Sequence, residues 1–199
     1  MIFITGAARS GTSLTCEIFE ACGAEFGKTN SLKENTFVRN RIVKTYLSSI
    51  GCDPLAQNPL PLKKDLRPDP DWREKVLAGL NGVEIYKGAK MCLMWEIWHK
   101  AFPEAKWVIV RRDDEGIIDS CLRTSFMRAY NTADGWQKWL DVHLKRFEEM
   151  KKHLDVVEVW PKHFKDGKDC GCMQKAVEFC GFEWNEEAAR ARINPSLLR

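Results

Sequence analysis

Near its beginning, the chain carries a short glycine-flanked segment rich in side chains that bind anions. The segment reads GAARSGTS, from Gly6 to Ser13, and directly follows an apolar run at residues 2–5. A loop of this kind between a buried strand and a helix turns backbone N–H groups and the helix N-terminus onto an anion. Arg9 adds a delocalised positive charge, and hydroxyl groups follow it on Ser10, Thr12 and Ser13. We therefore expect this segment to bind a phosphate or a related anion rather than to form an ordinary turn.

The segment departs from the loop of nucleotide triphosphatases, in which a lysine follows the second glycine. That lysine reaches the terminal phosphates, while the next hydroxyl and an aspartate from another strand hold Mg²⁺. Here Thr12 stands in the place of the lysine, and the apolar run at 107–110 leads into Arg111 and Arg112 before any acid. The sequence therefore disfavours a magnesium-dependent triphosphate site, and we expect no metal.

Arg112 and Ser120 form the second candidate anion site. Arg112 lies just past the apolar run at 107–110, and Ser120 follows a little over two turns into the next predicted helix. Taken alone, an arginine at a strand end is more often a surface charge, or a salt-bridge partner of Asp113 or Asp114. Taken together with the first loop, the pair predicts a ligand that carries two separated phosphates.

The surrounding elements predict an α/β fold with three layers and a central parallel sheet. Apolar runs at residues 2–5, 83–86, 107–110 and 156–159 are typical of strands. Helical spacing follows the first and third runs and recurs at 35–48, 134–154 and 172–180, with Asp134 and Gln137 as an expected capping pair. Strands that alternate with helices form parallel sheets, which bind ligands at their carboxyl ends. Both anion sites would lie at that edge.

Composition limits the classes of protein to which the chain can belong. Its 199 residues fit one domain, 1–199, with a proline-rich excursion at about 51–71 that is either a lid, a substrate wall or a plain connector. With 31 basic and 28 acidic residues, the net charge of +3 is too small to indicate a nucleic-acid surface. No apolar run is long enough to span a membrane. The cysteines lie mostly in apolar stretches and no leader precedes the first strand, so we expect reduced thiols in a cytoplasmic protein.

At this point the sequence resembles the sulfotransferases that use 3′-phosphoadenosine-5′-phosphosulfate (PAPS). The likeness is carried by Arg9-Ser10-Gly11-Thr12-Ser13 and by VRRDDEGIIDS, which contains Arg112 and Ser120. It extends to YKGAK (86–90), to FPEAKWVIVRR (102–112) and to a C-terminal helix. The resemblance implies a P-loop-containing nucleotide-binding fold with PAPS as co-substrate. It also implies roles for the matching residues: the 5′-phosphosulfate would be held by Arg9, Ser10, Gly11, Thr12 and Ser13, and the 3′-phosphate by Arg112 and Ser120.

The general base is less clear from the sequence. In the small-molecule branch of that family a histidine follows the lysine of the second strand, but here Gly88 and Ala89 follow Lys87. The carbohydrate branch uses a glutamate in a Lys-Glu segment, and SLKENTF resembles it, so the resemblance implies Glu34 as base with Arg9 and Lys87 beside the sulfate. Glu34 could instead be only the N-terminal acid of the helix at 35–48. The four histidines, His99, His143, His153 and His163, are expected to be structural or solvent-facing. His143 follows Trp139 in the apolar pattern of the helix predicted at 134–154.

Several readings stay open at this stage. The leading hypothesis is a sulfotransferase acting on a hydroxyl or amine of a small-molecule or carbohydrate acceptor. A P-loop nucleotide or small-molecule kinase is disfavoured by the missing lysine, and a non-catalytic module that binds PAPS or its bisphosphate product is kept open by the missing histidine. The family's glycine-rich segment near the C-terminus is not found, since the chain ends INPSLLR. The sequence does not indicate the oligomeric state.

Overall fold

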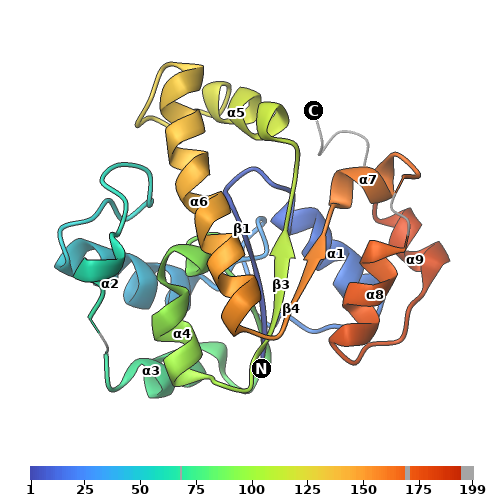
Figure 1. Cartoon of the computed structure of the whole chain (residues 1–199). Helices are drawn as coiled ribbons and strands as arrows, with labels where there is room; N and C mark the ends of the chain where they lie inside the picture. The colour runs from blue at the N-terminus through green and yellow to red at the C-terminus, as the bar shows by residue number, and fades with distance from the viewer. Residues whose placement is uncertain (68, 169–170, 194–199) are drawn as a thin grey trace.

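A single parallel sheet lies at the centre of the molecule (Figure 1). The computed structural model describes residues 1–67, 69–168 and 171–193. Its sheet has the strand order β2-β1-β3-β4, built from β1 (Ile2–Gly6), β2 (Ile85–Lys87), β3 (Lys106–Val110) and β4 (Val156–Val159). All three strand pairs are parallel. Pro68 of the proline-rich excursion, Cys170 and the C-terminal segment 194–199 lie outside the described residues.

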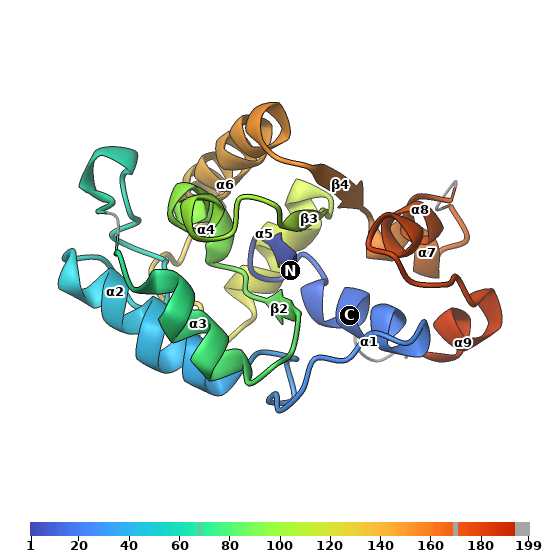
Figure 2. The ribbon, with the colours of Figure 1, turned by 90° about the horizontal axis from the view of Figure 1, so that it is seen from below.

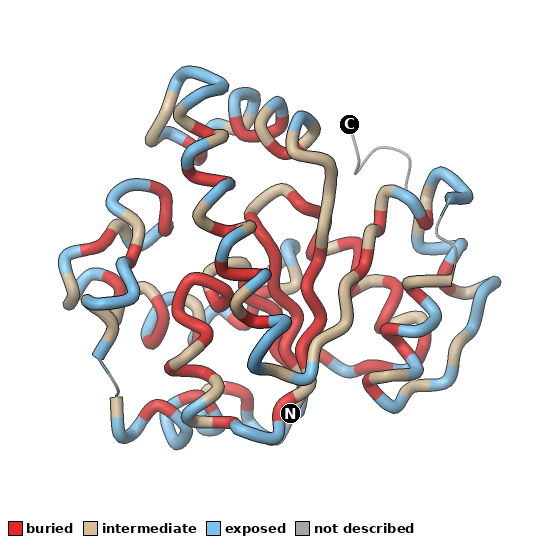
Figure 3. Tube along the Cα trace, in the orientation of Figure 1, coloured by how far each residue is buried: buried red, intermediate tan, exposed pale blue. Residues whose placement is uncertain are grey.

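Helices cover both faces of the sheet, which gives the three-layer α/β fold predicted from the sequence (Figure 2). One face carries Phe3 and Trp107 and packs against α3, α4 and α6, and the other carries Ile4 and Val108 and packs against α1, α8 and α9. Strands β1, β2 and β3 are almost wholly buried between these two layers, whereas β4 at the edge of the sheet is mostly half-buried (Figure 3). The α-helices are α1 (Thr12–Ala21), α2 (Lys44–Ser49), α3 (Trp72–Leu80), α4 (Trp95–Ala101), α5 (Asp114–Leu122), α6 (Ala133–His153), α7 (Pro161–Lys165), α8 (Cys172–Phe179) and α9 (Glu186–Ala191). The described chain also contains a π-helical segment, η1 (Val38–Val43), and two 3₁₀ turns, η2 (Lys63–Asp65) and η3 (Met91–Met94).

The close packing of β1 against β3 explains the glycine that ends β1. A Cβ atom on Gly6 would lie 2.5 Å from the carbonyl oxygen of Val110, so no larger residue fits without displacing a strand. The chain then turns sharply and enters α1 through Gly11, whose φ of 102° is one that glycine adopts at little cost. The glycines therefore fix where the first loop leaves the sheet.

Three local predictions differ from the structure. β2 begins at Ile85, two residues later than predicted, because Asn81 and Gly82 both have positive φ and form a turn before it. α6 is capped by Thr132, whose hydroxyl accepts from the amide of Gly135, so the predicted pair of Asp134 and Gln137 is wrong. Gln137 bonds to Asp141 one turn on instead. The helix predicted at 35–48 is present at 36–49 but contains the π-helical turn η1.

The proline-rich excursion is held against the rest of the molecule by Gln57. This side chain is buried and donates to the carbonyl of Phe126 at 2.8 Å, while its Oε1 accepts from the amides of Arg128 and Ala129. The indole N–H of Trp139 also donates to the carbonyl of Ala56 at 2.9 Å. The segment around Gln57 is therefore fixed to the loop before α6 and to α6 itself, and it forms one wall of a cavity.

Candidate active site

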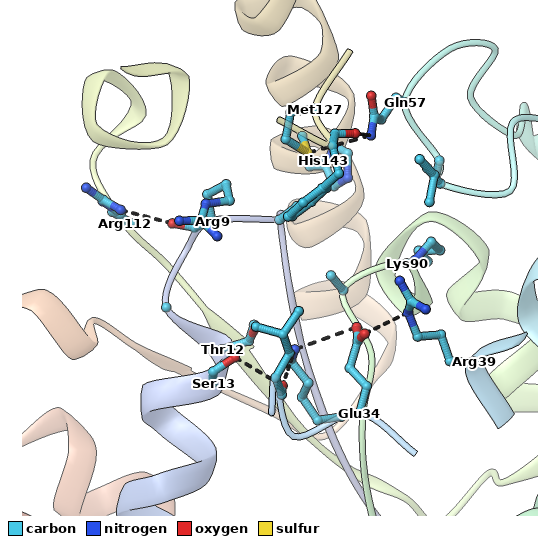
Figure 4. A pocket seen from close by; sticks show the side chains of 18 of the residues that line it. Arg9, Thr12, Ser13, Glu34, Arg39, Gln57, Lys90, Arg112, Met127 and His143 are labelled. Carbon is cyan, nitrogen blue, oxygen red and sulfur yellow. Dashed lines mark hydrogen bonds and ion pairs between the residues drawn. The ribbon is translucent and has the colours of Figure 1, made fainter. Parts of the chain in front are cut away.

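A cavity of about 450 Å³ lies at the carboxyl ends of the strands, where the sequence places the two anion sites (Figure 4). The loop after β1, the end of β2 and the segment after β3 all reach it. Of the predicted site residues, those that line it are Arg9, Gly11, Thr12, Ser13, Glu34, Lys87 and Arg112. Ser10 of the loop and Ser120 of α5 are buried beside the cavity rather than on its surface, and the hydroxyl of Ser120 bonds to Arg9 of the loop. The structure thus brings the predicted residues to one edge of the sheet.

The first loop leads into the N-terminus of α1, where no side-chain cap or acidic side chain of the helix offsets the positive end of the helix dipole. Gly11 caps α1 without a side-chain hydrogen bond, and the first turn of α1 has no acidic residue. Its backbone N–H groups and the positive end of the helix dipole are therefore free to face an anion. Arg9 takes a left-handed conformation, with φ of 73°, which is unusual for a residue with a side chain. That conformation turns its guanidinium towards α5.

Arg9 joins the two predicted anion sites. Its Nε donates to the hydroxyl of Ser120 at 2.8 Å, and its carbonyl accepts from Nη1 of Arg112 at 3.1 Å. Asp113, a candidate salt-bridge partner of Arg112, pairs with Lys162 instead. Arg112 makes no ion pair within the described part of the chain. The segments that were predicted to bind two separate phosphates are thus in direct contact.

Two buried donors at this junction lack partners. The hydroxyl of Ser10 and Nε of Arg112 have no hydrogen-bond partner among the described residues. A buried donor left unsatisfied costs about 1–3 kcal/mol, and more when it is charged. Both groups can donate to an anion, and no described residue engages either of them. The residues present therefore fit a ligand with phosphate groups.

Glu34 lies in a small network of charges on the opposite side of the loop. Its carboxylate is buried and lies 2.7 Å from Nε of Arg39 and 3.6 Å from Nζ of Lys87. Lys87 also donates to the carbonyl of Leu32 at 3.0 Å, and the hydroxyl of Ser13 donates to the same oxygen at 3.1 Å. Lys87 is thus held between Glu34 and the phosphate loop, and each oxygen of Glu34 faces a cation.

Lys90 is a further cation at the cavity. Burial lowers its pKa to about 8, and the neighbouring Arg39, Lys44 and Lys87 act in the same direction. The cavity is lined by five cationic side chains, from Arg9, Arg39, Lys87, Lys90 and Arg112, against the two carboxylates of Glu17 and Glu34. This excess of positive charge favours an anionic ligand.

Sequence reasoning missed several residues at the cavity. Arg39 and Gln57 lie in segments whose patterns carry no motif for this position, whereas Lys90 belongs to the YKGAK segment and was considered as a helper beside the sulfate. His143 and Trp139 were recognised, but as part of the apolar face of the long helix. In the structure both rings line the cavity. The feature of the sequence that pointed to this was a histidine among the apolar residues of the helix.

Comparison with known proteins agrees with this geometry. A family model described as a sulfotransferase domain matches residues 1–186. The chain belongs to the sulfotransferase family. Its activity is therefore the transfer of a sulfate group to an acceptor. A search of curated proteins finds no match.

The described part of the sulfotransferase offers neither a metal-binding cluster nor a membrane-spanning helix. No cluster of three or more His, Cys, Asp or Glu side chains that could hold a metal ion occurs in the described ranges. No helix in the same ranges is long and apolar enough to cross a membrane. The cysteines that the structure describes are all free thiols, most of them buried.

Proposed function

We propose that the sulfate donor is PAPS and that the acceptor is a hydroxyl or amine of a small molecule. The observation that carries this proposal is the contact of Arg9 with both Ser120 and Arg112, beside buried donors that lack partners. A donor with a 5′-phosphosulfate and a separate 3′-phosphate supplies an anion for each of the two joined sites. A nucleotide with a single phosphate chain would leave one site without a ligand.

Each predicted binding residue has a role in this proposal. The amides at the start of α1 and the hydroxyls of the loop, on Ser10, Thr12 and Ser13, bind the 5′-phosphosulfate. Arg112 and Ser120 bind the 3′-phosphate. Sulfate transfer builds negative charge on the oxygen that leaves with the 5′-phosphate, and the planar guanidinium of Arg9 suits that oxygen. Lys87, held beside Ser13, stabilises charge on the transferred group.

Glu34 as general base stays a prediction. Both of its oxygens face cations in the structure, so neither oxygen is free to face an acceptor hydroxyl. We propose that its first role is to position Lys87. Glu34→Gln should then leave bisphosphate binding intact and lower turnover. A general-base role for Glu34 predicts the same result.

Ligand-dependent thermal stability tests the donor assignment. Adenosine 3′,5′-bisphosphate should raise Tm more than AMP does, and Mg-ATP should have the smallest effect. Arg112→Ala should remove the advantage of the bisphosphate over AMP, since losing a charged hydrogen bond weakens binding by about 10- to 100-fold. Arg123→Ala is a matched control, because Arg123 lies at the C-terminal end of α5, the helix that follows Arg112, but is exposed and paired with Asp119.

The outcomes separate the candidate functions. Stabilisation by Mg-ATP alone would favour a kinase and overturn the proposal. An unchanged preference in Arg112→Ala would show that the 3′-phosphate binds elsewhere. A protein that binds the bisphosphate but transfers no labelled sulfate to any acceptor would be the non-catalytic binding module.

A further inference from the structure

One end of the cavity is not used by the two anion sites. We call it the acceptor compartment, and it is formed by the side chains of Leu55, Gln57, Phe126, Met127, Trp139 and His143. Figure 4 shows His143, Met127 and Gln57 together on one side of the cavity, with Arg9 and Arg112 on another and Glu34 opposite. An acceptor in this compartment would therefore face the phosphate loop.

The compartment is built from three segments that are distant in sequence. Gln57 of the proline-rich excursion bonds to the backbone at 126–129, and Trp139 of α6 bonds to the backbone of Ala56. These bonds satisfy the amide of Gln57 and the indole N–H of Trp139, so neither group is left to bind a ligand's polar atoms. The wall they form is rigid and offers apolar surface.

The lining of the compartment is apolar and uncharged at neutral pH. Leu55 and Phe126 are 37% and 40% exposed at its mouth, although both are large apolar side chains. The cationic side chains of the cavity belong to other segments, namely the phosphate loop, η1 and the ends of β2 and β3. Apolar surface favours an apolar ligand and gives no compensation for burying a charged one. The acceptor should therefore have an uncharged, apolar body.

His143 is the titratable side chain of this compartment. It is 2% exposed, and its Nδ1 lies 2.9 Å from the carbonyl oxygen of Trp139. A carbonyl can only accept, so Nδ1 carries the hydrogen and Nε2 carries the lone pair in the neutral ring. Nε2 has no hydrogen-bond partner in the part of the chain that is described. The ring thus presents a fixed acceptor to the cavity.

Burial also keeps this ring neutral. It lowers the pKa of His143 to about 4, and the positive charge of nearby Arg146 acts in the same direction. The lone pair of Nε2 is therefore available at neutral pH. Glu34 differs, because both of its oxygens are paired with cations.

We propose that the acceptor is a small uncharged alcohol with an apolar body, and that Nε2 of His143 takes the proton of its hydroxyl. This inference rests on the proposed function. The acceptor oxygen forms a bond to sulfur while the bond between sulfur and the bridging oxygen of the 5′-phosphate breaks. The electron pair of that bond leaves with adenosine 3′,5′-bisphosphate, and the proton passes from the acceptor to Nε2 and then to solvent. The base assigned here differs from the one predicted from the sequence.

Acceptors of graded acidity test this assignment. Transfer of labelled sulfate would be measured from PAPS to a series running from cyclohexanol through phenol to increasingly acidic nitrophenols, with glucose as a polar control. His143→Ala should lower kcat by about 10²- to 10⁴-fold for the least acidic acceptors that react. The loss should shrink to within about threefold for acceptors already ionised in the assay, because these need no base. Added imidazole should restore activity with the weakly acidic acceptors.

Two controls keep folding separate from catalysis. The bisphosphate must still raise Tm of His143→Ala, and His143→Gln repeats the measurement with a larger side chain in case the alanine variant does not fold. Leu55→Asp and Phe126→Asp place a charge at the exposed mouth of the compartment. They should raise KM for apolar acceptors at least tenfold and leave bisphosphate binding unchanged.

The proposal and the function on which it rests fail in different ways. A loss in His143→Ala that is equal for acidic and weakly acidic acceptors, or that imidazole does not restore, would overturn the role of His143. Transfer to glucose but not to the apolar alcohols would overturn the acceptor class. In both cases stabilisation by the bisphosphate would still support the proposed donor, whereas loss of that stabilisation in the unmodified protein would overturn the proposed function itself.

Discussion

His143 shows how one buried side chain links stability to pH. Its ring is enclosed by the acceptor compartment, and this burial favours the neutral form more strongly than the hydrogen bond to the carbonyl of Trp139 favours the charged form. Because burial lowers its pKa to about 4 from an ordinary value of 6.5, the unfolded chain binds a proton before the folded chain does. The stability that this group contributes is therefore complete above about pH 6.5.

Acid should destabilise the protein through this residue. As pH falls from about 6.5 to about 4, the free energy of unfolding should fall by on the order of 3 kcal/mol from His143 alone. Urea unfolding at several pH values would measure the slope. His143→Gln should reduce the slope over this range, and a variant with the same slope as the unmodified protein would contradict the expectation. His99→Gln is the control, since His99 lies outside the compartment.

At the scale of elements, the site depends on contacts between segments far apart in sequence. The phosphate loop and the pair of Arg112 and Ser120 follow strands directly, so local patterns predicted their positions. The contact of Gln57 with residues 126–129 spans about 70 residues, and nothing in either segment alone indicates it. The same limit applies to Glu34, whose pairing with Lys87 depends on how the segment after α1 folds back over β2.

Removing the Gln57 side chain should loosen the acceptor compartment without affecting the anion sites. Gln57→Ala leaves one carbonyl and two amides without their partner, which should cost about 1–3 kcal/mol of stability. Hydrogen exchange of the Arg128 and Ala129 amides should accelerate, while exchange within β1 and β3 should change only with global stability. Gln57→Glu is an informative second variant, because it keeps the acceptor oxygen but loses the donor to Phe126. Unchanged exchange at both amides in Gln57→Ala would show that other contacts hold the loop.

At the scale of the whole molecule, the two apolar layers bury most thiols. Cys16 lies in the layer formed with α1, and Cys92 and Cys121 lie in the other layer. Burial raises the pKa of each to about 12, so little reactive thiolate exists in the folded protein. Cys172, at the start of α8, is half-buried.

These thiols should therefore report on unfolding of the whole chain. In native buffer, iodoacetamide should label Cys172 quickly and Cys16, Cys92 and Cys121 only at the rate at which the protein opens. Bisphosphate at about 100 times its Kd should slow the labelling of the three buried thiols by about 100-fold and leave Cys172 unchanged. Peptide mapping by mass spectrometry distinguishes the sites. If Cys16 reacted as fast as Cys172, the layer around α1 would open independently of the rest.

The overall architecture was easier to predict than the chemistry of the cavity. Alternating strands and helices indicated the parallel sheet, and the glycines of the first loop indicated where it leaves β1. His143 was assigned to the apolar face of its helix, which is correct, but periodicity does not show that part of that face is left uncovered. Whether a residue on an apolar face is packed or lines a cavity depends on which segments lie against it. Here one of those segments is the excursion that Gln57 bonds to residues 126–129, far away in the sequence.

The hydrogen bonds of Gln57 also bear on how the acceptor specificity of the sulfotransferase can evolve. Its amide binds the carbonyl of Phe126 and the amides of Arg128 and Ala129, which are backbone atoms, and its one side-chain partner there is the sulfur of Met127 at 3.7 Å. Every amino acid except proline supplies the same backbone groups, so the side chains of Phe126, Arg128 and Ala129 can be exchanged while the wall stays in place. Selection, in nature or in the laboratory, can thus alter the shape of the compartment at Phe126 without remaking the scaffold or the donor site.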